Sequence, residues 1–159
     1  MEIKVGMADM NVCSAPDSII TLGLGSCIGV VLWDKEKKVC GMVHVMLPDS
    51  TIISQNTNRA KFADTGIQDL LSKVIAMGAK KERIVAKIAG GAQMFSVNTK
   101  SPSLRVGERN AAAVKSMLSQ LNIKLIAEDC GGNYGRTVLF YPETGEYVIK
   151  AIGREVKSI

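Results

Sequence analysis

The feature that most constrains the fold is a change in the spacing of apolar residues about a third of the way along the chain. Three β-rich runs come first, at residues 18–22, 28–33 and 39–46, and glycine-rich or charged turn segments separate them. Residues 58–77 instead place their apolar side chains at steps of three and four, and Gly78 follows as a C-cap. This switch from strand to helix spacing predicts an α+β fold.

The remainder of the chain also contains both strand and helix patterns. Residues 84–89 are typical of a buried strand, and residues 108–121 of a second helix. Three more strands are predicted at residues 123–128, 137–141 and 147–152, with a Pro-Glu-Thr-Gly turn between the last two. No repeat, linker or low-complexity segment divides the sequence. We therefore expect one domain over residues 1–159, an αβ sandwich with two main helices and a largely antiparallel or mixed sheet.

Charge and composition argue against several classes of function. The net charge is +5, but the basic residues are spread along the chain and no aromatics are interleaved with them, so nucleic acid is not an expected partner. An acidic protein surface would suit this charge equally well. No apolar run approaches the length of a membrane span, and residues 1–10 do not resemble a signal peptide. We expect a cytoplasmic protein without membrane insertion.

Cysteine and histidine usage limits the metal chemistry. Cys13, Cys27, Cys40 and Cys130 form no CxxC pair, and the chain has a single histidine, His44. Zinc sites need three or four such ligands, so neither a metal nor another cofactor is expected. An even number of cysteines leaves disulfides open, but reduced thiols are the favoured interpretation.

The segment with candidate chemistry is a glycine-rich stretch that ends at Cys27 and is followed by a strand, a charged turn and His44. If the turn is centred between Lys35 and Glu36, Cys27 and His44 lie directly opposite each other on an antiparallel pair. Directly opposed residues hold their Cβ atoms about 5 Å apart on one face of the sheet. The pattern therefore predicts a thiol within reach of an imidazole, provided that no bulge shifts the register.

Such a pair suits nucleophilic attack on a carboxamide. The imidazole accepts the thiol proton or holds the thiolate, and backbone N–H groups must stabilise the oxyanion that forms. The loop before Cys27, with Gly23, Gly25 and Ser26, is the candidate for those donors. A third group usually orients the base, and Thr21 is the nearest suitable hydroxyl upstream.

Structural interpretations of the same residues stay open. A free cysteine is commonly buried as a small hydrophobe, and a lone histidine in an apolar strand is commonly packed or hydrogen-bonded. The glycine clusters at residues 90–91 and 131–135 are either turns at strand ends or walls of a substrate cleft. Arg109, Asn110 and Arg136 could bind a partner, but a solvated surface position is the favoured interpretation.

Taken together, the motifs resemble the chemoreceptor glutamine deamidase family, CheD. They occur in order at residues 21–27 (TLGLGSC), 41–44 (GMVH), 61–64 (KFAD), 90–95 (GGAQMF), 107–110 (GERN) and 131–136 (GGNYGR). The resemblance implies a fold related to cytotoxic necrotizing factor-type deamidases. It also implies Cys27 as nucleophile, His44 as base and Thr21 as the third member of the triad.

The activity implied by the resemblance is conversion of glutamine side chains in chemoreceptor cytoplasmic domains to glutamate, with release of ammonia. Hydrolysis of receptor glutamyl methyl esters would use the same acyl-enzyme chemistry. The resemblance also implies a second partner, the phosphatase CheC. Because the receptor substrate is a helical coiled coil, we expect an open site rather than a deep pocket.

Two other functions compete with this one. The first is a non-catalytic binding module that holds and stimulates CheC, with Cys27 used little or not at all. The second is a cysteine protease, which is a poorer match because hydrolysis of a side-chain amide needs no extended peptide groove.

Overall fold

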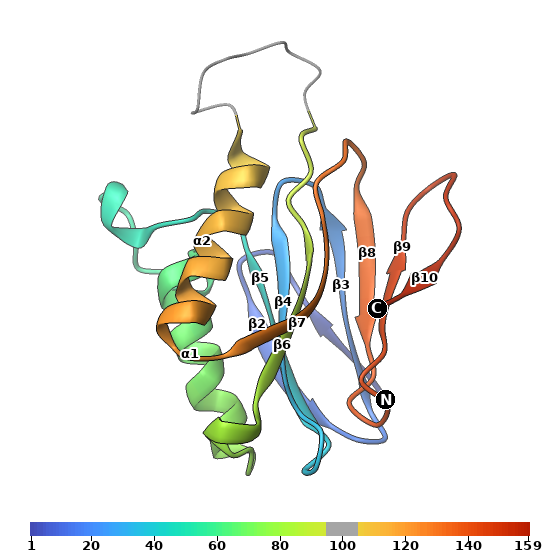
Figure 1. The fold of residues 1–159 in the computed structure, drawn as a ribbon. Helices are drawn as coiled ribbons and strands as arrows, with labels where there is room; N and C mark the ends of the chain where they lie inside the picture. The colour runs from blue at the N-terminus through green and yellow to red at the C-terminus, as the bar shows by residue number, and fades with distance from the viewer. Residues whose placement is uncertain (95–104) are drawn as a thin grey trace.

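Two five-stranded sheets lie face to face, and two helices cover the outer face of one of them, in a computed structural model that describes residues 1–94 and 105–159 (Figure 1). The central sheet lies between the helices and the other sheet, and its strands in spatial order are β2 (Met10–Ser14), β5 (Val39–Val45), β4 (Ile28–Asp34), β6 (Val85–Gly90) and β7 (Lys124–Cys130). The second sheet, called the outer sheet here, contains β1 (Glu2–Val5), β3 (Ser18–Leu24), β8 (Arg136–Phe140), β9 (Tyr147–Lys150) and β10 (Lys157–Ser158).

Both sheets are mixed. The pairs β1–β3 and β6–β7 are parallel, and the other pairs are antiparallel. The helices are α1 (Ala63–Ala76) and α2 (Val106–Gln120), and three 3-10 turns lie at Ser50–Ile52, Arg59–Lys61 and Lys81–Arg83. The predicted α+β class with two main helices is confirmed.

The central sheet is covered on both faces, which explains its sequence. All seven residues of β4 and all seven of β5 are buried. Along β4 the side chains of Ile28, Val30 and Leu32 pack with the helices, whereas Val31 and Trp33 pack with the outer sheet. Alternate residues of a strand point to opposite faces, so continuous apolar runs result where both faces are buried.

The first helix and three strands differ from the prediction. The first helix starts at Ala63 rather than near residue 58, because Phe62 is extended (φ −112°, ψ 142°) and Arg59–Lys61 form a separate 3-10 turn capped by Asn58. Strands β1, β2 and β10 were not predicted. The first two are partly exposed, and their short sequences carry only a weak alternating pattern.

No helix within residues 1–94 and 105–159 is both long enough and apolar enough to cross a membrane.

Candidate active site

Thr21 and His44 meet between the two sheets. Thr21 lies on β3 of the outer sheet and His44 on β5 of the central sheet, and both side chains are almost fully buried. The Thr21 Oγ1 atom lies 2.7 Å from His44 Nδ1. This hydrogen bond joins the layers at the point where the sequence predicted a base and its orienting hydroxyl.

The partners of the Thr21 hydroxyl determine the tautomer of the imidazole. Thr21 Oγ1 donates its only proton to the backbone carbonyl of Val5, at 2.8 Å. A carbonyl oxygen can only accept, so the Thr21 oxygen must accept from His44, and Nδ1 carries the proton. In a neutral imidazole Nε2 then holds a lone pair. Among the residues that the structure describes, this buried Nε2 has no hydrogen-bond partner.

Cys27 lies directly before β4 and its side chain packs in the core between the sheets, on the same face as Val31 and Trp33. The predicted register with His44 is wrong: Gly29, not Cys27, is paired with His44. Cys27 therefore lies two residues before the residue that pairs with His44, and is diagonal to His44 on the same face. Diagonal neighbours on an antiparallel pair are farther apart than opposed ones but still within reach of longer side chains.

The turn between β4 and β5 explains the shift of register. Asp34 pairs with Val39, so the turn has four residues and is centred between Glu36 and Lys37. The Asp34 carboxylate accepts hydrogen bonds from the backbone N–H groups of Glu36 and Lys37, and Lys38 takes a positive φ of 56°. The side-chain bonds of Asp34 thus fix a longer turn than the predicted one. Because the shift is two residues, it preserves the face on which each side chain lies.

Because Gly29 has no side chain, residues of the outer sheet pack close to the backbone beside His44. A Cβ atom at Gly29 would lie 2.7 Å from the Tyr147 hydroxyl and 3.2 Å from Leu24 Cδ1. The same Tyr147 hydroxyl donates to the Gly29 carbonyl at 2.8 Å. A larger residue at this position would therefore push against the outer sheet next to the imidazole.

The loop before Cys27 is held by backbone hydrogen bonds. Gly91 donates to the Cys27 carbonyl and Ala92 to the Gly25 carbonyl, both at 2.9 Å. Gly25 donates its own N–H to the Gly23 carbonyl at 3.1 Å, so this predicted oxyanion donor is already engaged. In the described part of the chain, no backbone carbonyl accepts from the N–H groups of Ser26 or Cys27.

Gly23 takes a φ of +71°, and the register between β3 and β8 shifts between Thr21 and Leu24. This irregularity lets the chain turn out of the outer sheet and cross to Cys27. The left-handed φ at Gly23 is a conformation that glycine adopts without a steric cost.

The predicted glycine clusters lie against this loop. Gly90 has a positive φ, and a Cβ atom there would collide with the Cys27 carbonyl oxygen. Gly131 donates to the Gly90 carbonyl at 3.0 Å, and the Gly132 carbonyl accepts from Gln93 at 2.9 Å. The two clusters thus form adjoining turns at the end of the sheet where Cys27 lies. Phe95, which ends one of the family motifs, lies outside the described residues.

Burial favours the neutral forms of both reactive groups. It raises the pKa of the Cys27 thiol and lowers the pKa of the His44 imidazole. Burial thus favours a thiol and a neutral imidazole over a thiolate and an imidazolium. An imidazole in this state can accept a proton as the thiol attacks.

The site is more enclosed than expected. Cys27 keeps 8% of its surface exposed and His44 none. The open site expected from a coiled-coil substrate is therefore not what the structure has, because the outer sheet covers the imidazole. One cavity of 230 Å³ opens on the outer sheet, and Gly23, Gly135 and Arg136 are among the residues that line it.

The prediction that Asn110 and Arg136 lie on the solvated surface is wrong. Asn110 is fully buried and Arg136 is 3% exposed. The Arg136 Nε donates to Asp129 Oδ2 at 3.0 Å, and its guanidinium lies over the ring of Tyr134. Arg109, by contrast, lines an open groove between the two helices.

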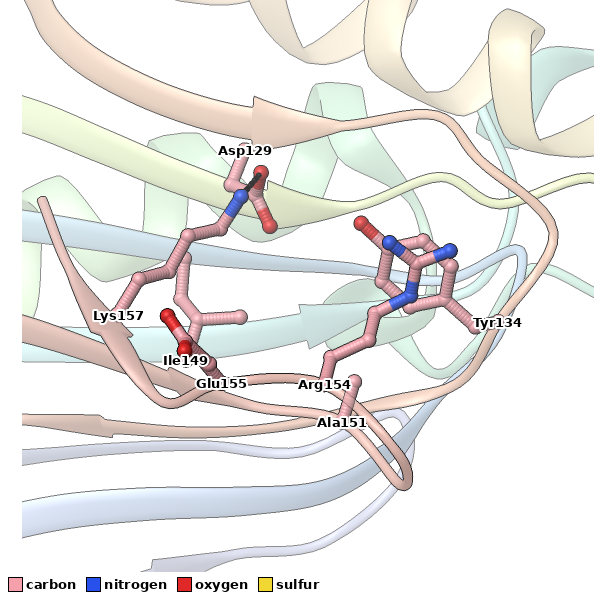
Figure 2. A pocket seen from close by; sticks show the side chains of 7 residues that line it. All are labelled: Asp129, Tyr134, Ile149, Ala151, Arg154, Glu155 and Lys157. Carbon is pink, nitrogen blue, oxygen red and sulfur yellow. Dashed lines mark ion pairs between the residues drawn. The ribbon is translucent and has the colours of Figure 1, made fainter.

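A separate pocket of 310 Å³ lies beside this cluster (Figure 2). Lys157 extends toward Asp129, and the Arg154 guanidinium lies over the Tyr134 ring, 3.8 Å from its centroid. Lys157 and Asp129 form an ion pair in this pocket, and neither Cys27 nor His44 lines it.

The other cysteines are free and packed. Cys13 and Cys40 face each other on β2 and β5, with their Sγ atoms 3.6 Å apart, and Cys130 is partly buried at the end of β7. Within the described ranges, no three His, Cys, Asp or Glu side chains are grouped so that they could hold a metal ion.

Fold and site together define an α+β protein of two stacked sheets, with a buried Thr21–His44 hydrogen bond between the sheets and Cys27 diagonal to His44 on the same face of the central sheet. Residues 46–151 match the family model described as CheD chemotactic sensory transduction. The chain belongs to the CheD family. The matched range begins just after His44, so the candidate triad lies outside it.

Curated relatives extend the similarity to nearly the whole chain. A protein of Lachnoclostridium phytofermentans named "Probable chemoreceptor glutamine deamidase CheD" is 60% identical over 157 residues, which cover 99% of this chain and 98% of the relative. A protein of Halalkalibacterium halodurans named "Chemoreceptor glutamine deamidase CheD" is 52% identical over 158 residues, covering 99% and 98%. A third relative, from Caldanaerobacter subterraneus, is 51% identical over 157 residues, covering 99% and 97%.

Proposed function

We propose that this chain is a protein-glutamine deamidase that converts glutamine side chains in the cytoplasmic domains of chemoreceptors to glutamate and releases ammonia. Membership of the CheD family supports the proposal, as do the names of relatives that share half or more of its residues. In the proposed site Cys27 is the nucleophile, His44 the base and Thr21 the residue that orients the base.

The observation that carries these roles is the Thr21–His44 hydrogen bond. It leaves Nε2 as the basic nitrogen, on the same face of the central sheet as the Cys27 side chain. The opposite tautomer would present an N–H to the sulfur and could not accept its proton. A neutral imidazole with a lowered pKa is also the form that a general base needs before the reaction starts.

In the first half-reaction the Cys27 thiol gives its proton to His44 Nε2 while the sulfur attacks the carboxamide carbon of the substrate. The carbonyl oxygen becomes an oxyanion, for which the N–H groups of Ser26 and Cys27 are the proposed donors. The imidazolium then protonates the departing nitrogen, the C–N bond breaks, and ammonia leaves. A thioester between Cys27 and the former glutamine side chain remains.

In the second half-reaction water replaces ammonia. His44 accepts a proton from the water as its oxygen attacks the thioester carbon, and the same donors stabilise the new oxyanion. The C–S bond then breaks, the sulfur recovers its proton from His44, and a glutamate side chain is released. A glutamyl methyl ester could form the same thioester with methanol as the leaving group, so we include ester hydrolysis in the proposal.

The enclosed site favours a slender substrate group. Only 8% of Cys27 is exposed, which suits the narrow side chain of a glutamine better than a peptide backbone with substituents on both sides. A protease would need a groove for an extended chain. Side-chain deamidation is therefore the better match to this geometry.

We also propose that the chain acts in the cytoplasm, where receptor signalling domains lie, and that it binds the CheC phosphatase. The proposal treats residues 1–159 as one hydrolase domain with a fold like that of cytotoxic necrotizing factor-type deamidases. The competing function, a binding module that stimulates CheC without catalysis, predicts that Cys27 is dispensable.

Ammonia release from a purified receptor cytoplasmic fragment tests the proposed function. The wild type is expected to release ammonia, and Cys27→Ala is expected to release none. Cys13→Ala provides a matched control, because it removes an equally buried thiol from the same core. Equal activity in Cys27→Ala and the wild type would overturn the proposed nucleophile, and loss of activity in both variants would indicate a structural role for the thiols.

A further inference from the structure

The side chain of Asn110 connects the two segments that carry Cys27 and His44. Asn110 lies in the first turns of α2 and is fully buried against the central sheet. Its Nδ2 atom donates to the Ser26 carbonyl and to the Met46 carbonyl, both at 2.9 Å. Ser26 immediately precedes Cys27, and Met46 lies two residues beyond His44.

From this bridge, and resting on the proposed function, we propose that Asn110 is a positioning residue for the deamidation reaction. It sets the separation between the Cys27 sulfur and His44 Nε2. The two groups lie on neighbouring strands in a diagonal register, so the pairing of β4 with β5 does not fix their distance as closely as a direct opposition would. The two hydrogen bonds of Asn110 hold the ends of both segments together and so constrain the distance between the sulfur and Nε2.

No backbone hydrogen bonds in the described residues take the place of the two bonds from Asn110. Elsewhere in the loop, Gly91 and Ala92 bind the carbonyls of Cys27 and Gly25. In the parts of the chain that the structure covers, no backbone N–H reaches the carbonyl of Ser26 or that of Met46. Both oxygens therefore depend on one amide nitrogen, whose two N–H bonds diverge in a plane and can reach two acceptors at once.

The other end of the Asn110 amide shows that only its nitrogen takes part in the bridge. Its Oδ1 atom is buried and has no partner among the described residues. A buried acceptor left unpaired costs free energy, but an apolar side chain of similar size would instead leave the Ser26 and Met46 carbonyls without their donor. Only a residue with two N–H donors can bind both carbonyls, which accounts for an asparagine at this position.

The test compares Asn110→Ala with Val114→Ala. Val114 lies one turn later on the same buried face of α2 and touches the core rather than the loop, so it controls for lost packing. We expect Asn110→Ala to lower kcat about 10- to 100-fold with KM changed less than about twofold, because small displacements of reacting groups cost rate rather than binding. Val114→Ala is expected to keep kcat within about twofold while it lowers the unfolding temperature.

A second readout does not need the receptor. The rate at which iodoacetamide alkylates Cys27, followed by peptide mass spectrometry across a pH series, reports how far the protein assists deprotonation of the sulfur. Asn110→Ala should slow alkylation near neutral pH, while Val114→Ala should leave the profile unchanged. Asn110→Ser, which retains one donor, replaces the alanine variant if that variant is too unstable to measure, and its alkylation near neutral pH should be slower than that of the wild type.

Equal losses of kcat and of alkylation in the Asn110 and Val114 variants would overturn the inference, and so would wild-type values in Asn110→Ala. Because alkylation is independent of the receptor, an altered profile in Asn110→Ala together with no deamidation by the wild type would refute the proposed function and leave the positioning role standing.

Discussion

Thr21 Oγ1 lies 2.7 Å from His44 Nδ1 while it donates its proton to the Val5 carbonyl, so one hydroxyl links β1, β3 and β5. The link orients the only imidazole in the chain and selects its tautomer. The bond therefore connects the packing of the two sheets to the chemistry of the proposed base.

Thr21→Val should separate this role from packing, because valine has the shape of threonine without the hydroxyl. We expect kcat to fall about 10- to 100-fold, since the ring loses the acceptor that fixes its orientation. Thr21→Ser retains the hydroxyl and should retain most of the activity. Ammonia release from a receptor fragment measures both variants, and a valine variant with wild-type kcat would remove Thr21 from the mechanism.

The acidic side of the pH profile should report His44. Burial lowers the pKa of this imidazole, so it stays neutral to a lower pH than an exposed histidine, whose pKa is about 6.5. As pH falls through the lowered pKa, Nε2 gains a proton and can no longer act as a base. We expect kcat/KM to decline only below about pH 6.5, and a decline centred above that value would contradict the assignment.

Cys27 should behave as a buried thiol in the absence of substrate. Burial raises its pKa, so the thiolate fraction near neutral pH is smaller than for a free cysteine, whose pKa is about 8.5. The rate of Cys27 alkylation by iodoacetamide is expected to rise with pH throughout the neutral range. A plateau reached already by about pH 6 would indicate a preformed thiolate–imidazolium pair instead.

Gly29→Ala should destabilise the protein next to the site. The added methyl group would lie 2.7 Å from the Tyr147 hydroxyl, and overpacking of this kind typically costs about 1–3 kcal/mol. Gly6→Ala is the control, since the nearest atom to its Cβ would be 4.0 Å away. Urea denaturation compares the free energies of unfolding, and equal values for the two variants would count against the close contact.

The turn that sets the β4–β5 register should be sensitive to acid. Burial opposes ionisation of Asp34, but hydrogen bonds from Arg83 and from the backbone N–H groups of Lys80 and Lys37 outweigh it and lower the pKa of Asp34 to about 2. An unfolded chain has an aspartate pKa of about 3.9, so the unfolded state takes up the proton first as pH falls.

The stabilisation from Asp34, on the order of 2 kcal/mol, is therefore present above about pH 4 and is lost as pH falls toward 2. Asp34→Asn should be less stable than the wild type at neutral pH and should lose less stability between about pH 5 and 2. Asp69→Asn, which removes a partner of Arg59 at the surface, serves as the control for a general effect of charge. Parallel stability curves for the wild type and Asp34→Asn would contradict the account.

The spacing of apolar residues was enough to predict the fold class, and the hairpin register predicted that Cys27 and His44 share one face of the sheet. A two-residue change of register does not alter that shared face. The register itself depends on the Asp34 carboxylate, which closes a four-residue turn through contacts that strand propensity does not describe.

The burial of Asn110 and Arg136 could not be predicted from sequence patterns. Asparagine and arginine are mostly exposed residue types, so a surface position was the natural expectation for Asn110 and Arg136. Their partners are distant in sequence: Asn110 binds carbonyls 84 and 64 residues away. The family motif that contains Asn110 was the only signal of its importance, and it gave no partner.

Peptide mass spectrometry of a chemoreceptor cytoplasmic fragment, incubated with the wild type or with Cys27→Ala, distinguishes a deamidase from a binding module. We expect specific glutamines to become glutamates with the wild type alone, while Cys27→Ala remains folded and leaves every glutamine unchanged. Conversion by neither protein, in samples shown to be folded and reduced, would contradict the deamidase and favour a module that acts by binding CheC.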